Sequence, residues 1–216
     1  MSRYAAMFER LAKSGEGAFG AFLMLGDPNL ETSARLLDAA VEGGADMIEV
    51  GIPFSDPIAD GPVIQASAER ALKQNVRPAD AFSLLADFRR RHPQIPVGIL
   101  TYANLVMARG RDAFCRASVE AGADSLLVAD VPVFEAEPFV AAAARVHFPR
   151  ELNWLFIGPS GPHIIGKAAR ACASAMGSPA RYNRSTPGGI SYGGNASVRG
   201  IKVRADIRHQ TVTGWS

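Results

Sequence analysis

One segment of the sequence combines an apolar stretch with carboxylates in a way that could carry out acid–base chemistry. It is the run from Ile48 to Pro62, which reads Ile-Glu-Val-Gly-Ile-Pro-Phe-Ser-Asp-Pro-Ile-Ala-Asp-Gly-Pro. Glu49 stands among apolar neighbours within 46–51, a stretch typical of a buried strand. An ionised carboxylate in such surroundings is unfavourable unless it is paired, so burial should raise the pKa of Glu49. A carboxyl group with a raised pKa suits general acid–base catalysis.

Two further carboxylates follow on the loop that we expect after this strand. Asp56 and Asp60 lie in residues 52–61, where Pro53, Pro57 and Gly61 fix the course of the backbone. This loop leaves the carboxyl end of the strand, which is where parallel α/β folds have their active sites. Glu49 and Asp60 are eleven residues apart, enough for the loop to fold back over the strand end. The alternative is structural, because a Glu near a strand end is often solvated and Asp-Pro and Asp-Gly pairs often form turns.

Other residues with possible chemical roles carry weaker signals. Tyr102 and Asn104 follow a predicted strand and could line a pocket, or could be a packed aromatic and a turn residue. Arg89-Arg90-Arg91 at a predicted helix end is interpreted as a solvated cluster that compensates the helix dipole. The histidines have no metal-ligand spacing, so we predict no metal site; they are His92, His147, His163 and His209.

The elements that must position these residues alternate between strand and helix. Hydrophobic periodicity predicts strands at 18–25, 46–51, 96–102 and 124–129, and helices at 1–13, 30–41, 63–72, 78–91, 112–120 and 135–146. Asn29 is expected to cap the second helix, and the glycines at 15–17 to end the first. The segment 42–50 is echoed at 120–128, which suggests a repeated unit. The pattern predicts an α/β fold with a parallel sheet, either doubly wound or a closed barrel.

The composition changes after residue 146. Residues 1–146 hold 14 Lys and Arg against 19 Asp and Glu, whereas residues 147–216 hold 9 against 2. A fifth strand at 153–158 and a weak helix at 163–176 are the only elements we predict there. We therefore divide the chain into 1–146 and an atypical, basic, Gly/Pro-rich segment, 147–216, that is partly unstructured or aberrant. This segment lacks regularly interleaved aromatics, so nucleic-acid binding is not favoured.

The cellular setting follows from what the sequence lacks. Cys115 and Cys172 are far apart, so idle thiols in a reducing compartment are expected rather than a disulfide. The N-terminus has charges throughout, unlike a signal peptide, and no apolar run is long enough to span a membrane. We expect a soluble, cytoplasmic protein.

Five motifs within roughly residues 2–146 share their order and spacing with one known family. They are Leu25-Gly-Asp-Pro28, the run from Glu49 to Pro62, Ile64-Gln65, Tyr102-Ala-Asn104 and Val128-Ala-Asp-Val-Pro132. In these motifs the sequence resembles the tryptophan synthase alpha chains. The resemblance implies a (β/α)8 TIM barrel, of which this chain holds about four to five recognisable βα units. It also implies the carbon–oxygen lyase class of tryptophan synthase, in which the alpha chain cleaves indole-3-glycerol phosphate to indole and glyceraldehyde 3-phosphate by a retro-aldol reaction in tryptophan biosynthesis.

The resemblance assigns roles to particular residues. Glu49 would exchange protons with the indole C3 carbon and the glycerol hydroxyl, and Asp60 would bind the indole N–H. The residues that would line the indole pocket are Phe22, Leu100, Tyr102, Leu127 and Ala129. Asp56 and Asn104 match surfaces that dock the beta chain in an alpha2beta2 tetramer. The alpha chain would need no cofactor, because pyridoxal phosphate belongs to the beta chain.

The sequence departs from the family after residue 146. The Gly- and Ser-rich loops that hold the substrate phosphate in the family, and its mobile closing loop, have no match there. The chain is also shorter than the roughly 250 residues of a complete barrel, and a shifted reading frame would account for the change in composition. Two alternatives to the lyase therefore stay open: a non-catalytic truncated remnant of the same family, and a different barrel enzyme acting on a phosphorylated sugar.

Overall fold

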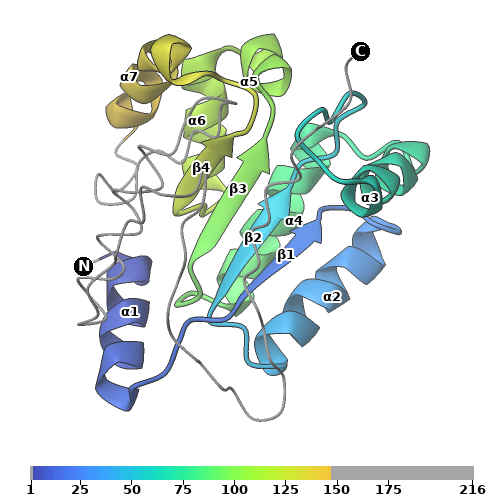
Figure 1. The fold of residues 1–216 in the computed structure, drawn as a ribbon. Helices are drawn as coiled ribbons and strands as arrows, with labels where there is room; N and C mark the ends of the chain where they lie inside the picture. Colours follow the sequence, from blue (N-terminus) through green and yellow to red (C-terminus); the bar gives the residue numbers. More distant parts are fainter. Residues whose placement is uncertain (1, 147–216) are drawn as a thin grey trace, which may run out of the picture.

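A computed structural model of the chain describes residues 2–146. Their centre is a four-stranded sheet, with strands β1 (Gly20–Met24), β2 (Met47–Gly51), β3 (Val97–Thr101) and β4 (Ser125–Val128). Neighbouring strands are all parallel and follow the sequence order β1-β2-β3-β4 (Figure 1). A doubly wound sheet reverses its strand order at a switch point, whereas this order adds each unit on the same side. Of the two architectures that the sequence left open, the arrangement is that of consecutive units of a barrel.

Helices follow the strands as predicted up to residue 146. They are α1 (Arg3–Ser14), α2 (Leu30–Glu42), α3 (Pro62–Lys73), α4 (Pro78–Arg91), α6 (Arg111–Glu120) and α7 (Glu137–Arg145). Gly15 ends α1 in the left-handed region at φ 68°, and the Asn29 side chain accepts a hydrogen bond from the Thr32 backbone N–H at the start of α2. Both ends were expected, because glycine tolerates that conformation and asparagine can accept a free N–H.

Two elements were missed by sequence reasoning. Helix α5 (Ala103–Arg109) follows β3, and a short 3₁₀ turn, η1 (Val133–Glu135), precedes α7. The N–H of Ala103 donates to Oδ1 of Asp130 at 2.7 Å, so the first turn of α5 is capped from beyond the next strand. Because this cap is 27 residues away in sequence, the local pattern indicated only a turn around Asn104.

The two faces of the sheet have different coverings. The face that carries Ile48, Val50, Val97 and Ile99 packs against α2, α4, α6 and α7, and together they form the main hydrophobic core (Figure 1). The opposite face, which we call the inner face, is covered at its amino-terminal end by α1, whose buried side chains are Tyr4, Met7 and Leu11. Side chains alternate between the two faces along each strand, so the strand residues that pack against the core helices are different from those on the inner face.

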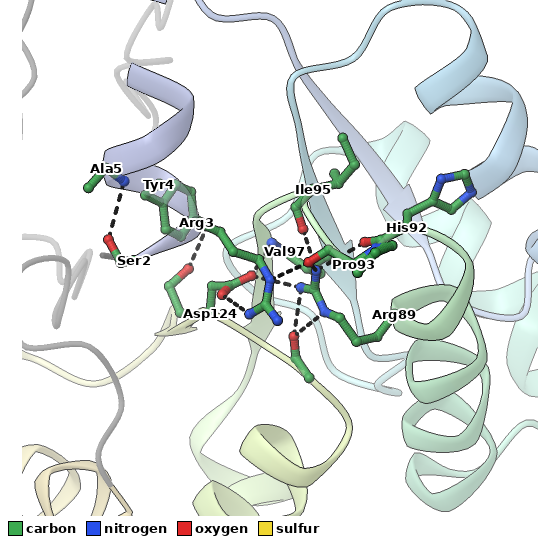
Figure 2. Close-up of polar contacts among 12 residues, drawn as sticks. Ser2, Arg3, Tyr4, Ala5, Arg89, His92, Pro93, Ile95, Val97 and Asp124 are labelled. Carbon is green, nitrogen blue, oxygen red and sulfur yellow. Dashed lines mark hydrogen bonds and ion pairs between the residues drawn. The ribbon is translucent and has the colours of Figure 1, made fainter. Parts of the chain in front are cut away.

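The arginine run at the end of α4 does not form one solvated cluster, so that prediction was wrong for Arg89. Its side chain is only 12% exposed, and it donates to Oδ2 of Asp124 at 2.7 Å and to the carbonyl oxygens of Gly122 and Ile95 at 2.7 and 2.6 Å (Figure 2). A buried guanidinium with these acceptors links α4 to the segments that precede β3 and β4. Arg90 is exposed and pairs with Asp87, as a solvated cluster would.

The remaining predictions on fold lie outside the described residues. They are the strand at 153–158, the helix at 163–176 and the partly unstructured character of 147–216. Within residues 2–146, no helix is both long enough and apolar enough to cross a membrane.

Candidate active site

Glu49 lies at the middle of β2 with its side chain on the inner face. It is in register with Phe22 of β1 and Gly98 of β3. Burial raises the pKa of the Glu49 carboxyl, and the negative charge of Asp60 raises it further. The sequence had indicated the first of these causes, since the neighbours of Glu49 along the strand are apolar. A half-buried carboxyl whose pKa is raised in this way is suited both to give and to take a proton.

Asp60 reaches the inner face from the loop after β2. Burial raises the pKa of its carboxyl, while a hydrogen bond from the Tyr102 side chain lowers it. Its Oδ2 atom is buried and has no hydrogen-bond partner among the residues that the structure describes. A buried acceptor without a partner is unfavourable by about 1–3 kcal/mol, so this oxygen is suited to receive an N–H group from a ligand.

The loop that carries Asp60 is held in place by helix α3. The side-chain amide of Gln65 donates to the carbonyl oxygen of Asp60 at 2.8 Å, and the Asp60 N–H donates to the carbonyl of Pro57 at 3.0 Å. Sequence reasoning gave Gln65 no role, although it belongs to one of the motifs that carried the resemblance. These bonds fix the backbone on which the Asp60 carboxylate is mounted.

Tyr102 connects this loop to the end of β3. Its ring stacks on Phe54 with centroids 5.2 Å apart, and its hydroxyl accepts the Ala59 N–H at 3.2 Å. Burial and the charge of Asp60 raise the pKa of the Tyr102 hydroxyl above its ordinary range. The hydroxyl is therefore protonated at neutral pH and serves as a donor to Asp60.

The five residues expected to line an apolar pocket share the inner face. Leu100 and Leu127 are in register on β3 and β4, and Phe22 lies beside Glu49 on β1; Tyr102 and Ala129 continue the same alternation just beyond their strands. Phe22 and Leu100 are partly exposed, whereas the other three are buried. Among the described residues these side chains form one apolar lining next to the two carboxyl groups.

The space beside this lining is open on the β1 side. A cavity of about 230 Å³ lies at the β1 edge, between β1, α2 and α3; its lining includes Phe22, Met24 and Ile64 but neither Glu49 nor Asp60. A Cβ atom added to Gly51 would lie 2.9 Å from the Phe22 ring and 2.9 Å from the methyl group of Met24. Because Gly51 has no side chain, the side chains of Phe22 and Met24 can lie over β2 at this position.

Asp56 and Asn104 lie on the rim formed by the carboxyl ends of the strands. Asp56 is exposed in the loop after β2 and accepts a hydrogen bond from the Ser55 hydroxyl at 2.6 Å. Asn104 is exposed at the start of α5, after β3. Both are accessible to a partner and neither is part of the apolar lining.

Titratable side chains are not grouped for metal binding in the described part of the chain. Residues 2–146 contain no group of three or more His, Cys, Asp or Glu side chains arranged to hold a metal ion. His92 pairs with Asp38 at 2.8 Å on the outer helices. The predictions for His147, His163 and His209 lie outside the described residues. The arrangement at the inner face can transfer protons and can bind a flat apolar group that carries an N–H.

Comparisons with known proteins agree with this geometry. The family model described as Tryptophan synthase alpha chain matches residues 8–150. The chain is 53% identical over 145 residues to the tryptophan synthase alpha chain of Serratia proteamaculans, an alignment that covers 67% of this chain and 54% of the relative. It is 54% identical over 145 residues to that of Klebsiella pneumoniae, with the same coverage.

Solved structures give the same relationship. The alpha subunit of tryptophan synthase from Legionella pneumophila (strain Paris) is similar with a TM-score of 0.65 and 35% identity, over 68% of this chain and 56% of that one. A tryptophan synthase complex from Pyrococcus furiosus is similar with a TM-score of 0.58 and 40% identity, over 61% and 53%. The described residues therefore have the fold of the matching part of these TIM barrels. The chain spans about half the length of the curated relatives it matches.

Proposed function

Because the chain belongs to the tryptophan synthase alpha chain family, we propose that it is a lyase that cleaves indole-3-glycerol phosphate to indole and glyceraldehyde 3-phosphate. The observation that carries the proposal is the half-buried Glu49 on an apolar face, with its pKa raised by burial and by Asp60. The reaction is a retro-aldol cleavage, which needs one proton delivered to carbon and one removed from a hydroxyl group.

Glu49 performs both proton transfers in this proposal. Its carboxyl group protonates C3 of the indole ring, and the resulting carboxylate takes the proton of the glycerol hydroxyl as the bond between C3 and the glycerol carbon breaks. A raised pKa supports both steps, because the group is a usable acid and a usable base near the same pH.

Asp60 stabilises the positive charge that develops on the ring. The unpartnered Oδ2 atom of Asp60 accepts the indole N–H. The hydrogen bond from Tyr102 opposes the effect of burial on the pKa of Asp60 and so favours the carboxylate form. Phe22, Leu100, Leu127 and Ala129, together with the Tyr102 ring, enclose the indole. An acid with a raised pKa beside an ionised carboxylate divides the two roles between two similar groups.

No cofactor takes part in these steps. Pyridoxal phosphate is assigned to the partner beta chain, and we propose a cytoplasmic location for the protein.

Residues 2–146 supply the proton-transfer groups and the indole pocket. We assign no described residue to the substrate phosphate. Residues 1–146 are proposed to be the amino-terminal part of the barrel, and 147–216 a separate, atypical segment.

Indole release from indole-3-glycerol phosphate by the purified 216-residue chain tests the proposal. We expect measurable release that falls by at least about 100-fold in Glu49→Gln. Glu69→Gln, on the exposed surface of α3, is the matched control and should retain wild-type activity. Equal rates in the wild type and Glu49→Gln would contradict the assignment. A folded chain without any turnover would instead favour the alternative of a non-catalytic remnant.

The partner of the proposed enzyme is the tryptophan synthase beta chain, in an alpha2beta2 tetramer. A similar solved protein is described as the tryptophan synthase a2b2 complex of Pyrococcus furiosus. Asp56 and Asn104 are exposed on the rim of the strands' carboxyl ends, where the indole would leave the site. Titration of labelled beta chain should give about tenfold weaker binding for Asp56→Ala or Asn104→Ala. Asp87→Ala on α4 should bind as the wild type does, and equal affinity of all three variants would exclude this surface.

A further inference from the structure

Helix α1 covers the part of the inner face that lies below Glu49. Its buried side chains pack with Met47 of β2, two residues before Glu49 on the same face of the strand. Tyr4 is the most amino-terminal of them and is 8% exposed. The first turn of α1 therefore separates this part of the inner face from solvent.

The Tyr4 hydroxyl lies in the same row of the inner face as Glu49. It is hydrogen-bonded to Oγ of Ser125 at 2.9 Å, and Ser125 is in register with Gly98, which is in register with Glu49. A Cβ atom on Gly98 would lie 2.9 Å from Ser125 Oγ and 3.2 Å from the Tyr4 hydroxyl, so this pair fills the space over the glycine. Burial, with smaller contributions from the charges of Asp124 and Glu49, raises the pKa of Tyr4 to about 12.

Arg3 ties the first turn of α1 to the sheet in addition to the hydrogen bond of Tyr4 with Ser125. Arg3 donates from Nη1 to Oδ1 of Asp124 at 2.8 Å and from Nε to the carbonyl oxygen of Pro93 at 2.6 Å. Figure 2 shows Arg3 from α1 and Arg89 from α4 both directed at Asp124. Asp124 directly precedes Ser125, so the ion pair of Arg3 and the hydrogen bond of Tyr4 connect consecutive residues of α1 to consecutive residues at the start of β4.

Asp124 is fixed independently of Arg3. It is 4% exposed, and its Oδ2 accepts from Arg89 Nη2 at 2.7 Å and from the Val97 N–H at 2.8 Å. Arg3 is 37% exposed, so it is the partner that can leave. The other end of α1 has its own tie, the ion pair of Arg10 with Asp46 at 2.5 Å. Loss of Arg3 would therefore release the turn that carries Tyr4 without releasing the whole helix.

We propose that the Arg3–Asp124 ion pair is a latch that holds α1 closed beneath Glu49, and that Arg3 and Tyr4 are positioning residues for proton transfer by Glu49. The proposal rests on the proposed function of Glu49. With the latch closed, the Tyr4 ring and the Tyr4–Ser125 pair keep water from the underside of the carboxyl group. With the latch open, water hydrates the carboxylate and stabilises its charged form. The titratable groups that face Glu49 are Tyr4 from α1 and Asp60 from the loop after β2, with Asp124 beyond Tyr4.

The test is a titration of the Glu49 carboxyl by NMR in the full-length chain labelled with ¹³C at the glutamate side chains, with the signal assigned by Glu49→Gln. We expect Arg3→Gln to lower the Glu49 pKa by about half a unit or more, because displacement of the first turn of α1 lets water solvate the Glu49 carboxylate. Arg3→Lys keeps the positive charge beside Asp124 and should recover most of the shift. Lys13→Gln is the matched control, because it makes the same change in charge but removes only the ion pair between Lys13 and Glu9 within α1. In this variant Glu49 should titrate as it does in the wild type.

A second variant tests the role of the ring. Tyr4→Ala removes the ring that covers the underside of the Glu49 carboxyl while leaving the Arg3–Asp124 pair intact. It should therefore lower the Glu49 pKa, as Arg3→Gln does. The latch is overturned if Glu49 titrates in folded Arg3→Gln as it does in the wild type. An unchanged Glu49 titration in folded Tyr4→Ala would overturn the role given to the Tyr4 ring. This readout does not depend on turnover. A wild-type chain that fails to cleave indole-3-glycerol phosphate would defeat the proposed function, yet its Glu49 titration would still report on the latch.

Discussion

Asp60 lies close enough to Glu49 for its negative charge to raise the pKa of the Glu49 carboxyl. The loop that brings Asp60 there is fixed by Gln65, so the spacing of the two groups is set by the fold and not by a flexible side chain alone. Because like charges disfavour simultaneous ionisation, removal of one charge should ease ionisation of the other.

Asp60→Asn should therefore lower the pKa of Glu49 toward its ordinary value, although burial would keep it raised. Carboxyl NMR titration measures the change directly. Asp56→Asn is the matched control, because Asp56 is exposed in the same loop and is no cause of the Glu49 shift. An unchanged Glu49 titration in Asp60→Asn would mean that the two carboxylates do not interact.

The raised pKa of Glu49 should also make the folded chain less stable at neutral pH. The folded state holds the proton to higher pH than the unfolded state, whose value is near 4.5. Below that value both states are protonated and Glu49 has no effect; stability is lost as pH rises from 4.5 through the raised folded pKa. Glu49→Gln removes this loss.

Urea unfolding at two pH values checks the prediction. Glu49→Gln should have a higher free energy of unfolding than the wild type at pH 7, and the difference should shrink toward zero near pH 4. Glu69→Gln should show no such gain, because Glu69 is exposed and its pKa is lowered by Lys73. A difference that stays constant with pH would mean that the Gln variant acts through packing and not through ionisation.

Much of this site could be predicted from sequence because its determinants are local. Glu49 sits in an apolar strand, and the alternation along β3 and β4 puts Leu100 and Leu127 on the same face as Glu49. The caps at Gly15 and Asn29 likewise depend on residues within one helical turn. Each of these features needs only the strand or helix period and the chemistry of one side chain.

The features that sequence reasoning missed depend on contacts between distant segments. Helix α5 takes its cap from Asp130, and the Asp60 loop takes its support from the Tyr102 hydroxyl as well as from Gln65. None of these contacts produces a periodic pattern in the sequence. The three arginines at the end of α4 are alike in sequence, and only the fold distinguishes buried Arg89 from exposed Arg90.

Tyr102→Phe should weaken substrate binding while leaving the fold intact. The ring keeps its stacking on Phe54, but Asp60 loses a donor and the Ala59 N–H loses its acceptor. The pKa of Asp60 should rise, because the hydrogen bond from Tyr102 lowers it. We expect kcat/KM for indole-3-glycerol phosphate to fall by about tenfold, which corresponds to one lost hydrogen bond to a charged group. The loss should be greatest at acidic pH, where Asp60 of the variant is protonated, and a pH-independent loss would contradict this account.

Arg89 and Arg90 form a matched pair for testing how much burial matters. Arg89→Ala removes a guanidinium that binds Asp124 and four carbonyl oxygens. It leaves Asp124 buried with only Arg3 and the Val97 N–H as partners. Loss of one partner from a buried ion pair costs about 3–5 kcal/mol. Arg90→Ala removes only an exposed pair with Asp87, for which about 0.5 kcal/mol or less is expected.

Urea denaturation of the two variants under the same conditions measures both effects. Since both substitutions remove one positive charge from neighbouring positions of the same helix, any difference must come from what each side chain touches. Equal destabilisation would mean that Asp124 is solvated in solution, in which case neither α1 nor the start of β4 has the anchor described for it. A loss confined to Arg89→Ala would instead identify the Asp124 cluster as the point where α1, α4 and β4 are joined.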